Sequence, residues 1–79
     1  MTAIEDRVTK ILVEDFKVRP EDLADGATLR DLGFDSLVIV ELSLSLDNEF
    51  GVELGDGELT DTMSVAGAAE LLLAKGVSP

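Results

Sequence analysis

The feature that most constrains this chain is the complete absence of cysteine and histidine from a sequence of only 79 residues. A domain of this size buries only about 60% of the surface that its unfolded chain exposes. The missing cysteines exclude disulfides, thiolate metal sites and cysteine nucleophiles, and the missing histidines exclude zinc sites and Ser-His-Asp catalysis. Residues 1–79 must therefore form one small domain that depends on a compact apolar core.

Composition separates this chain from several other classes of protein. Hydrophobic residues make up 46% of it, which argues against disorder despite a net charge of −11. The same acidic balance argues against nucleic acid as a partner, because phosphate binding needs a basic surface. No apolar run exceeds four residues, too few for a membrane span, and the N-terminal MTAIEDRV lacks the apolar core of a signal peptide. We therefore expect a cytoplasmic, monomeric protein with no membrane partner.

The first segment, from Thr2 to about Phe16, has the pattern of an amphipathic helix. Its apolar residues recur with the helical period: Ile4, Val8, Ile11, Leu12 and Phe16. Thr2 and Glu5 fit a capping box, in which each side chain binds the other residue's backbone N–H. Pro20 then restricts Arg19 to an extended conformation and prevents any continuation of the helix.

A long connection, from Val18 to Asp35, is expected after this helix. The segment is rich in turn formers, and Thr28 and Asp31 repeat the spacing of a capping box before Gly33. Its scattered apolar residues are expected to anchor the loop to the core: Leu23, Leu29, Leu32 and Phe34. Long loops in compact domains are uncommon and tend to carry function.

A second helix is predicted from Ser36 to Phe50. Asp35 or Ser36 supplies its N-cap, and Gly51 ends it. The expected inward face consists of Val40, Leu42 or Ser43, Leu46 and Phe50. Further apolar residues lie outside that face: Leu37, Val38, Ile39 and Leu44. A strand would also suit the β-branched run at residues 38–40, but a single strand would have no partner.

The remainder of the chain predicts one short and one longer helix. The segment from Gly55 to Asp61 has room for a short third helix between its turn residues. Ser64 can cap a fourth helix that ends near Gly76. The apolar face of this fourth helix consists of Val65, Ala68, Ala69 and Leu72. The predicted fold is all-α, a small four-helix bundle of three main helices and one short helix, with a long loop between the first two.

No catalytic or metal site is expected from the sequence. A chain of this size offers no cleft for a sugar, and the acidic segment near residues 47–58 lacks the alternating spacing of an EF-hand loop. Ser36 is the one candidate functional residue, because it lies between the long loop and the second helix. It could simply cap that helix, or it could accept a phosphoryl group, which a helix N-terminus stabilises. The residues alone leave both interpretations open.

Three motifs resemble the acyl carrier protein family: LGFDSL at residues 32–37, VEL at 40–42 and EFGV at 49–52. The order and spacing of the expected helices also resemble the family, over essentially the whole chain. The resemblance implies that Ser36 receives 4′-phosphopantetheine from coenzyme A through a magnesium-dependent phosphopantetheinyl transferase. The thiol of that arm would carry an acyl group as a thioester, and the chain itself would catalyse nothing.

The resemblance also implies a surface that binds partner enzymes, centred on the second helix. The partners would be the transferase and acyltransferases, ketosynthases or other acyl-processing enzymes with basic surfaces. The expected recognition residues are Asp35, Leu37, Val38, Ile39, Glu41, Leu44 and Asp47. Core packing is the alternative role for Leu37 and Leu44. Residues 37–79 carry eight acidic side chains and one basic side chain, so opposite charge would speed encounter with such enzymes.

The residues after Ser36 differ from the usual pattern of fatty-acid carriers. Val38 and Ile39 stand where acidic or polar residues are common, so the face resembles that of polyketide-type carriers. We therefore expect a free-standing carrier of polyketide or related secondary metabolism. The alternatives are a fatty-acid or aminoacyl carrier and, in a different class, an acidic helical adaptor without a prosthetic group, in which Ser36 is only a cap.

Overall fold

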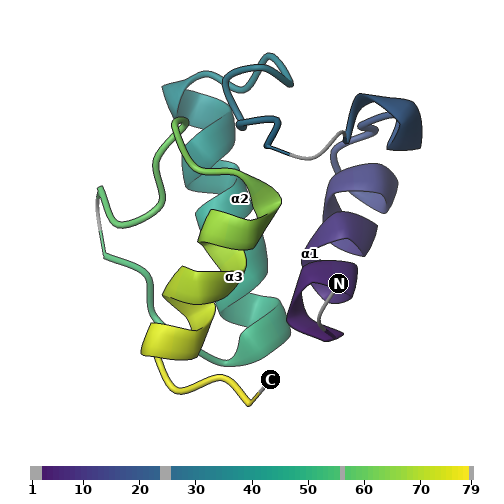
Figure 1. Ribbon diagram of the computed structural model, residues 1–79. Coiled ribbons are helices and arrows are strands. Elements are labelled where there is room, and N and C mark those ends of the chain that lie inside the picture. Colours follow the sequence, from purple (N-terminus) through teal and green to yellow (C-terminus); the bar gives the residue numbers. More distant parts are fainter. Residues whose placement is uncertain (1–2, 24–25, 56, 79) are drawn as a thin grey trace.

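The protein is described by a computed structural model that covers residues 3–23, 26–55 and 57–78. Three α-helices, α1 (Ala3–Glu14), α2 (Ser36–Phe50) and α3 (Val65–Ala74), form the bundle, and a 3₁₀-helix, η1 (Pro20–Asp22), follows α1 (Figure 1). The only extended pairing in the described segments is an isolated antiparallel bridge between Thr28 and Ser64. The prediction of an all-α fold is therefore confirmed.

The core lies where the apolar faces of the three helices meet. It also includes residues from the two connecting loops. Its fully or nearly buried members are Ile4, Val8, Ile11, Leu12, Leu29, Phe34, Ile39, Leu42, Leu46, Leu59, Ala68, Ala69 and Leu72. The helices α1 and α3 approach each other most closely. The small side chains of Ala68 and Ala69 on the inner face of α3 permit that approach.

The prediction of the inward face of α2 is wrong at one position. Val40 is 54% exposed, whereas Ile39 is only 8% exposed and lies in the core with Leu42 and Leu46. Apolar residues occur on both sides of this helix, so the sequence pattern alone does not decide which side faces inward. Tertiary packing selects Ile39 and leaves Val40 on the surface.

The prediction of a short third helix between Gly55 and Asp61 is also wrong for the residues that the structure describes there. The backbone N–H of Glu58 donates to the carbonyl of Gly55 at 3.1 Å, which closes a turn, and Gly57 has a positive φ of 82°. The carboxylate of Glu58 accepts the N–H of Gly55 and pairs with Lys75 at 2.7 Å. These contacts hold the segment as a loop across the end of α3. The short helical turn of this fold is η1 instead.

Most predicted helix boundaries are confirmed. Gly51, at φ 67°, ends α2 in the left-handed conformation, and Arg19 is extended before Pro20. Ser64 caps α3 by accepting the N–H of Gly67 at 3.2 Å. At the other end of α3, Val77 N–H donates to Leu72 and Gly76 N–H donates to Leu73, the bonding pattern of a Schellman motif.

The first helix ends two residues earlier than predicted, at Glu14. Lys17 adopts a positive φ of 60°, and the N–H of Val18 donates to the carbonyl of Leu12 at 3.0 Å, which turns the chain back over the helix end. Phe16 is half-buried and still packs against the core. The capping box predicted at Thr2 lies outside the described residues. None of the helices in the described residues is long and apolar enough to cross a membrane.

Candidate functional site

Ser36 is the first residue of α2, and its side chain is exposed to solvent. The preceding residue, Asp35, caps the helix: its Oδ1 accepts the backbone N–H of Val38 at 3.0 Å, and its carbonyl accepts that of Ile39 at 2.9 Å. The Ser36 hydroxyl has no hydrogen-bond partner among residues 3–23, 26–55 and 57–78. Asp35, and not Ser36, is therefore the cap.

The other serine at a helix start, Ser64, shows the contrasting arrangement. Its hydroxyl oxygen is the cap of α3, accepting the N–H of Gly67 at 3.2 Å, and its side chain is half-buried. Ser36 lies one position further along its helix, where the backbone is already helical. Of these two serines, only Ser36 presents a free hydroxyl to solvent.

The backbone around Ser36 favours a bound anion. The first amides of a helix have no acceptor within the helix, and those of Val38 and Ile39 bind Asp35 here. The N–H groups of Ser36 and Leu37 remain beside the free hydroxyl. Together with the positive end of the macrodipole of the 15-residue helix, they can stabilise the negative charge of a phosphate group on Ser36.

The loop before Ser36 is held by its own side chains. The N–H of Thr28 donates to Asp31 at 3.0 Å, and the N–H of Asp31 donates to the Thr28 hydroxyl at 3.2 Å, so the predicted second capping box is confirmed. The hydrogen bond from the Thr28 N–H to the Asp31 carboxylate, followed by an interaction of that carboxylate with the Thr28 hydroxyl, lowers the pKa of Asp31 below its ordinary value of 3.8. Phe34 is buried, and its ring centroid lies 5.7 Å from that of Phe16.

The same loop is also fixed to the segment that precedes α3. Backbone bonds join Leu29 N–H to the carbonyl of Met63 at 2.9 Å and Arg30 N–H to that of Asp61 at 2.8 Å. The Arg30 and Asp61 side chains form an ion pair at 3.1 Å. This pairing positions the Ser36 loop, and sequence reasoning missed it because the paired residues lie more than thirty positions apart.

The solvent-facing side of α2 carries an apolar stripe. Leu37, Val40 and Leu44 are 66%, 54% and 59% exposed, and their spacing places them on one face of the helix, with exposed Glu41 beside them. We call these three apolar residues the α2 stripe. The expected alternative of core packing is therefore wrong for Leu37 and Leu44. Val40, which was assigned to the core from sequence, belongs to this surface.

Three of the expected recognition residues do not lie on this open face. Ile39 is in the core, so its predicted place on the recognition surface is wrong. Val38 is half-buried and packs against the core. The carboxylate of Asp47 accepts the N–H of Leu54 at 3.0 Å in a half-buried position, which fixes the loop after α2. The structure assigns Asp47 a contact within the fold that its sequence position did not reveal.

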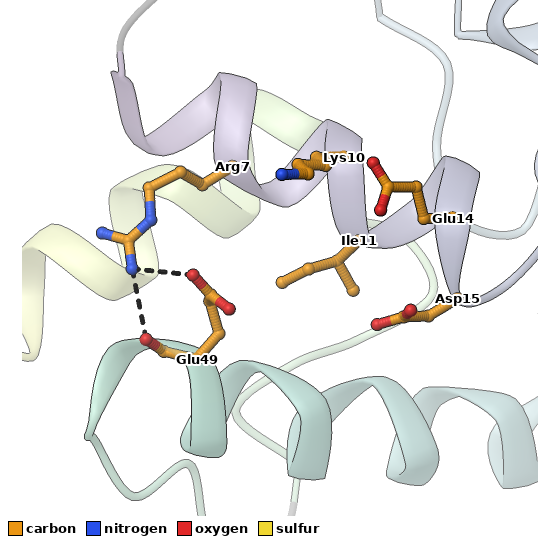
Figure 2. Close-up of a pocket in the computed structure, with 6 residues that line it drawn as sticks. All are labelled: Arg7, Lys10, Ile11, Glu14, Asp15 and Glu49. Carbon is orange, nitrogen blue, oxygen red and sulfur yellow. Dashed lines mark hydrogen bonds and ion pairs between the residues drawn. The ribbon is translucent and has the colours of Figure 1, made fainter.

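A groove of about 470 Å³ lies between α1 and α2 (Figure 2). It is lined by Arg7, Lys10, Ile11, Glu14, Asp15 and Glu49. At one end, Arg7 binds both the side chain and the backbone carbonyl of Glu49. Because Glu49 is thirteen residues after Ser36 in the same helix, about 20 Å along its axis, this groove is separate from the candidate attachment site.

Comparison with known proteins identifies the family to which the chain belongs. Residues 6–72 match the model of the family described as "Phosphopantetheine attachment site". The chain is 42% identical over 73 residues to an acyl carrier protein of Rhodopseudomonas palustris (strain BisB18) and 41% identical to one of Bradyrhizobium sp. (strain ORS 278). Each alignment covers 91% of this chain and 92% of the relative. The chain belongs to the acyl carrier protein family, whose members carry 4′-phosphopantetheine as cofactor and interact with acyl-processing enzymes.

Proposed function

We propose that Ser36 is the residue to which 4′-phosphopantetheine is attached, and that the chain carries acyl groups as thioesters without catalysing a reaction itself. The observation that carries this proposal is the cap at α2: Asp35 binds the Val38 N–H and leaves the Ser36 hydroxyl exposed and unbonded among the described residues. The family match, which spans residues 6–72, includes this serine. The adaptor alternative lacks such support.

The transfer to Ser36 is a phosphoryl-type substitution. The Ser36 oxygen forms a bond to the phosphorus of the pantetheine phosphate in coenzyme A, while the bond from that phosphorus to 3′,5′-ADP breaks. The nucleotide leaves, and the hydroxyl proton passes to a base of the transferase. The residues present fit the product, since the N–H groups of Ser36 and Leu37 at the start of α2 would stabilise the negative charge of the new diester. The bound group supplies a thiol, which this cysteine-free chain lacks.

We propose that partner enzymes dock on the α2 stripe, with Glu41 as its charged neighbour. The exposure of Leu37, Val40 and Leu44 beside the attachment serine supports this role. The transferase and acyl-loading or acyl-processing enzymes such as acyltransferases and ketosynthases would place an apolar surface with a basic residue against it. Such a contact combines charge-guided encounter with modest apolar burial, which suits a carrier that must be released.

We further propose that the carrier serves polyketide or related secondary metabolism, as a single monomeric domain in the cytoplasm. The sequence supports this assignment, because Val38 and Ile39 follow Ser36 where acidic or polar residues are common in fatty-acid carriers. A comparison of loading rates would test it, using a polyketide-type and a fatty-acid-type acyltransferase on the modified chain. Faster loading by the fatty-acid enzyme, or by an enzyme that activates amino acids, would overturn the polyketide assignment.

The attachment itself is tested by intact mass spectrometry. The chain and its Ser36→Ala variant are incubated with coenzyme A, magnesium and a phosphopantetheinyl transferase of broad specificity. We expect the original chain to gain the mass of one phosphopantetheine and the variant to gain none. Absence of any gain on the folded original chain would overturn the proposed function.

A further inference from the structure

The residue before the attachment serine performs a structural task that Ser36 could otherwise perform. Both side chains lie at the start of α2, and both are residue types that cap helices well. Asp35 occupies the N-cap position with an extended backbone, φ −93° and ψ −177°, and its Oδ1 accepts the Val38 N–H. The two candidates for the cap are thus resolved in favour of the carboxylate.

The loop geometry fixes Asp35 in this position. Phe34 directly before it is buried, and the N–H of Phe34 donates to the carbonyl of Leu29 at 3.1 Å. Leu29 in turn is tied to Met63. Asp35 is therefore placed between an anchored residue and the exposed Ser36, so its side chain reaches the first turn without displacing the serine.

We propose that Asp35 is a positioning residue for the modification of Ser36: by capping α2, it keeps the serine in the helix with its hydroxyl free. This inference rests on the proposed attachment at Ser36. Without the cap, the start of α2 would shift by one residue, and the Ser36 oxygen would accept an amide of the first turn, as Ser64 does in α3. A hydroxyl held in that way is displaced from the position at which it attacks phosphorus.

The capping role and a charge contact with the transferase make different demands on residue 35. Asparagine retains a good cap but has no charge, whereas glutamate retains the charge but is a poor N-cap residue. Loss of a partner contact raises the KM of the transferase for the carrier, because it weakens binding. Loss of positioning lowers kcat, because a misplaced nucleophile reacts slowly even when it is bound.

The experiment measures the transfer of phosphopantetheine to Asp35→Asn, Asp35→Glu and Asp35→Ala with coenzyme A, magnesium and one transferase. The rate at saturating carrier in a single turnover gives kcat for the chemical step, and its dependence on carrier concentration gives KM. We expect kcat to fall about tenfold or more for the glutamate and alanine variants and to stay within about twofold for asparagine. An unchanged kcat for Asp35→Glu, or an equal fall for all three variants, would overturn the proposal.

Ser64→Ala is the matched control, because it removes the side-chain cap of α3 and keeps the backbone through which Ser64 pairs with Thr28 of the Ser36 loop. It should lower the thermal stability by a similar amount to Asp35→Ala while leaving the transfer rate unchanged. A second readout follows the amides by NMR: in Asp35→Ala the chemical shift of the Val38 amide should move toward that of an unbonded N–H, and in Asp35→Asn it should not. Failure of the original chain to be modified would contradict the proposed function. Normal modification of Asp35→Glu together with slow modification of Asp35→Asn would contradict only this inference.

Discussion

Arg7 of α1 and Glu49 of α2 are joined by two bonds at the end of the bundle remote from Ser36. The Arg7 Nη2 donates to Oε2 of Glu49 at 2.9 Å and to its backbone carbonyl at 3.1 Å (Figure 2). The Arg7 guanidinium also lies 4.2 Å from the centroid of the Phe50 ring. One cation of α1 thus binds a carboxylate, a terminal carbonyl and an aromatic ring of α2, which is favourable at a helix C-terminus.

Replacement of Arg7 should therefore cost more than replacement of its carboxylate partner. Arg7→Ala loses all three contacts, and we expect the free energy of unfolding to fall by about 1–2 kcal/mol. Glu49→Gln keeps the carbonyl and ring contacts, so its cost should be about 0.5 kcal/mol or less at this half-exposed site. Urea denaturation measures both. Lys10→Ala is the control that also removes one positive charge from α1, and a cost equal to that of Arg7→Ala would contradict this account.

The pair of Glu58 and Lys75 predicts a pH dependence of stability. Lys75, followed by the Gly55 N–H, lowers the pKa of Glu58 in the folded chain below its ordinary value of 4.5. As the pH falls below 4.5, the unfolded chain binds this proton first, so the stabilisation by the ion pair decreases. It is lost once the pH has fallen below the lower pKa of Glu58 in the folded chain. Glu58→Gln should therefore be less stable than the original chain at pH 7, and the difference should shrink below pH 4.5.

Thermal denaturation across that pH range measures this difference. Glu53→Gln is the matched control, because it removes an exposed carboxylate that has no hydrogen bond or ion pair in the described residues. A gap between Glu58→Gln and the original chain that stayed constant at all pH values would contradict the ion pair. Protonation of the other acidic groups changes the thermal stability of Glu58→Gln and of the original chain equally, so it cancels in the difference between them.

Lys17 offers a stabilising substitution. It is the only non-glycine residue with positive φ in the described segments, at 60°, a conformation that costs about 1–2 kcal/mol with a side chain. Lys17→Gly should raise the free energy of unfolding by about 0.5–1 kcal/mol, since the greater freedom of the unfolded chain offsets part of the gain. Lys10→Gly, in the middle of α1, should lower it by about 1 kcal/mol. An equal fall in the free energy of unfolding for Lys17→Gly and Lys10→Gly would show that Lys17 is not strained.

The α2 stripe predicts how the carrier binds its transferase. Val40→Ser should raise the KM about fivefold, because it removes apolar burial worth about 1 kcal/mol from the contact. Leu73→Ser is the control, since Leu73 is an exposed apolar residue of α3 outside the stripe. Equal effects of the two variants would contradict docking on the stripe.

Charge should contribute to the rate of that encounter more than to its strength. Glu41→Arg should slow association several-fold, because it reverses the charge of an exposed acid beside the stripe. Transfer by the original chain should nevertheless persist from low to physiological ionic strength, since salt screens charges and leaves apolar burial in place. A collapse of transfer over that range would show a contact that depends mainly on charge.

Local signals explain which parts of this fold could be predicted from the sequence. The cap at Ser64 and the stop at Gly51 depend on residues within one helical turn, and both were predicted correctly. The cap of α2 was narrowed to Asp35 or Ser36 for the same reason. The inward side of α2 depends on where α1 and α3 lie, so Ile39 and Val40 were interchanged. The helix predicted after Gly55 was wrong because a distant residue, Lys75, binds Glu58.

The candidate site likewise has one part that could be predicted from local sequence and one part that could not. Ser36 could be singled out because a serine at the junction of loop and helix is a local pattern. The choice between a capping serine and a free one required the hydrogen bond between Asp35 and Val38. The attachment of the loop to Asp61 and Met63 is a contact between distant segments, and no periodicity in the sequence indicates it.

The most direct test of the central claim locates the phosphopantetheine within the modified chain. Fragmentation of the intact, modified protein by mass spectrometry assigns the added group to one residue. We predict that it resides on Ser36 alone, because this hydroxyl is exposed and unbonded in the described structure while the Ser64 hydroxyl is bound as a cap. A group found on another residue, or no modification of the folded chain, would contradict the account.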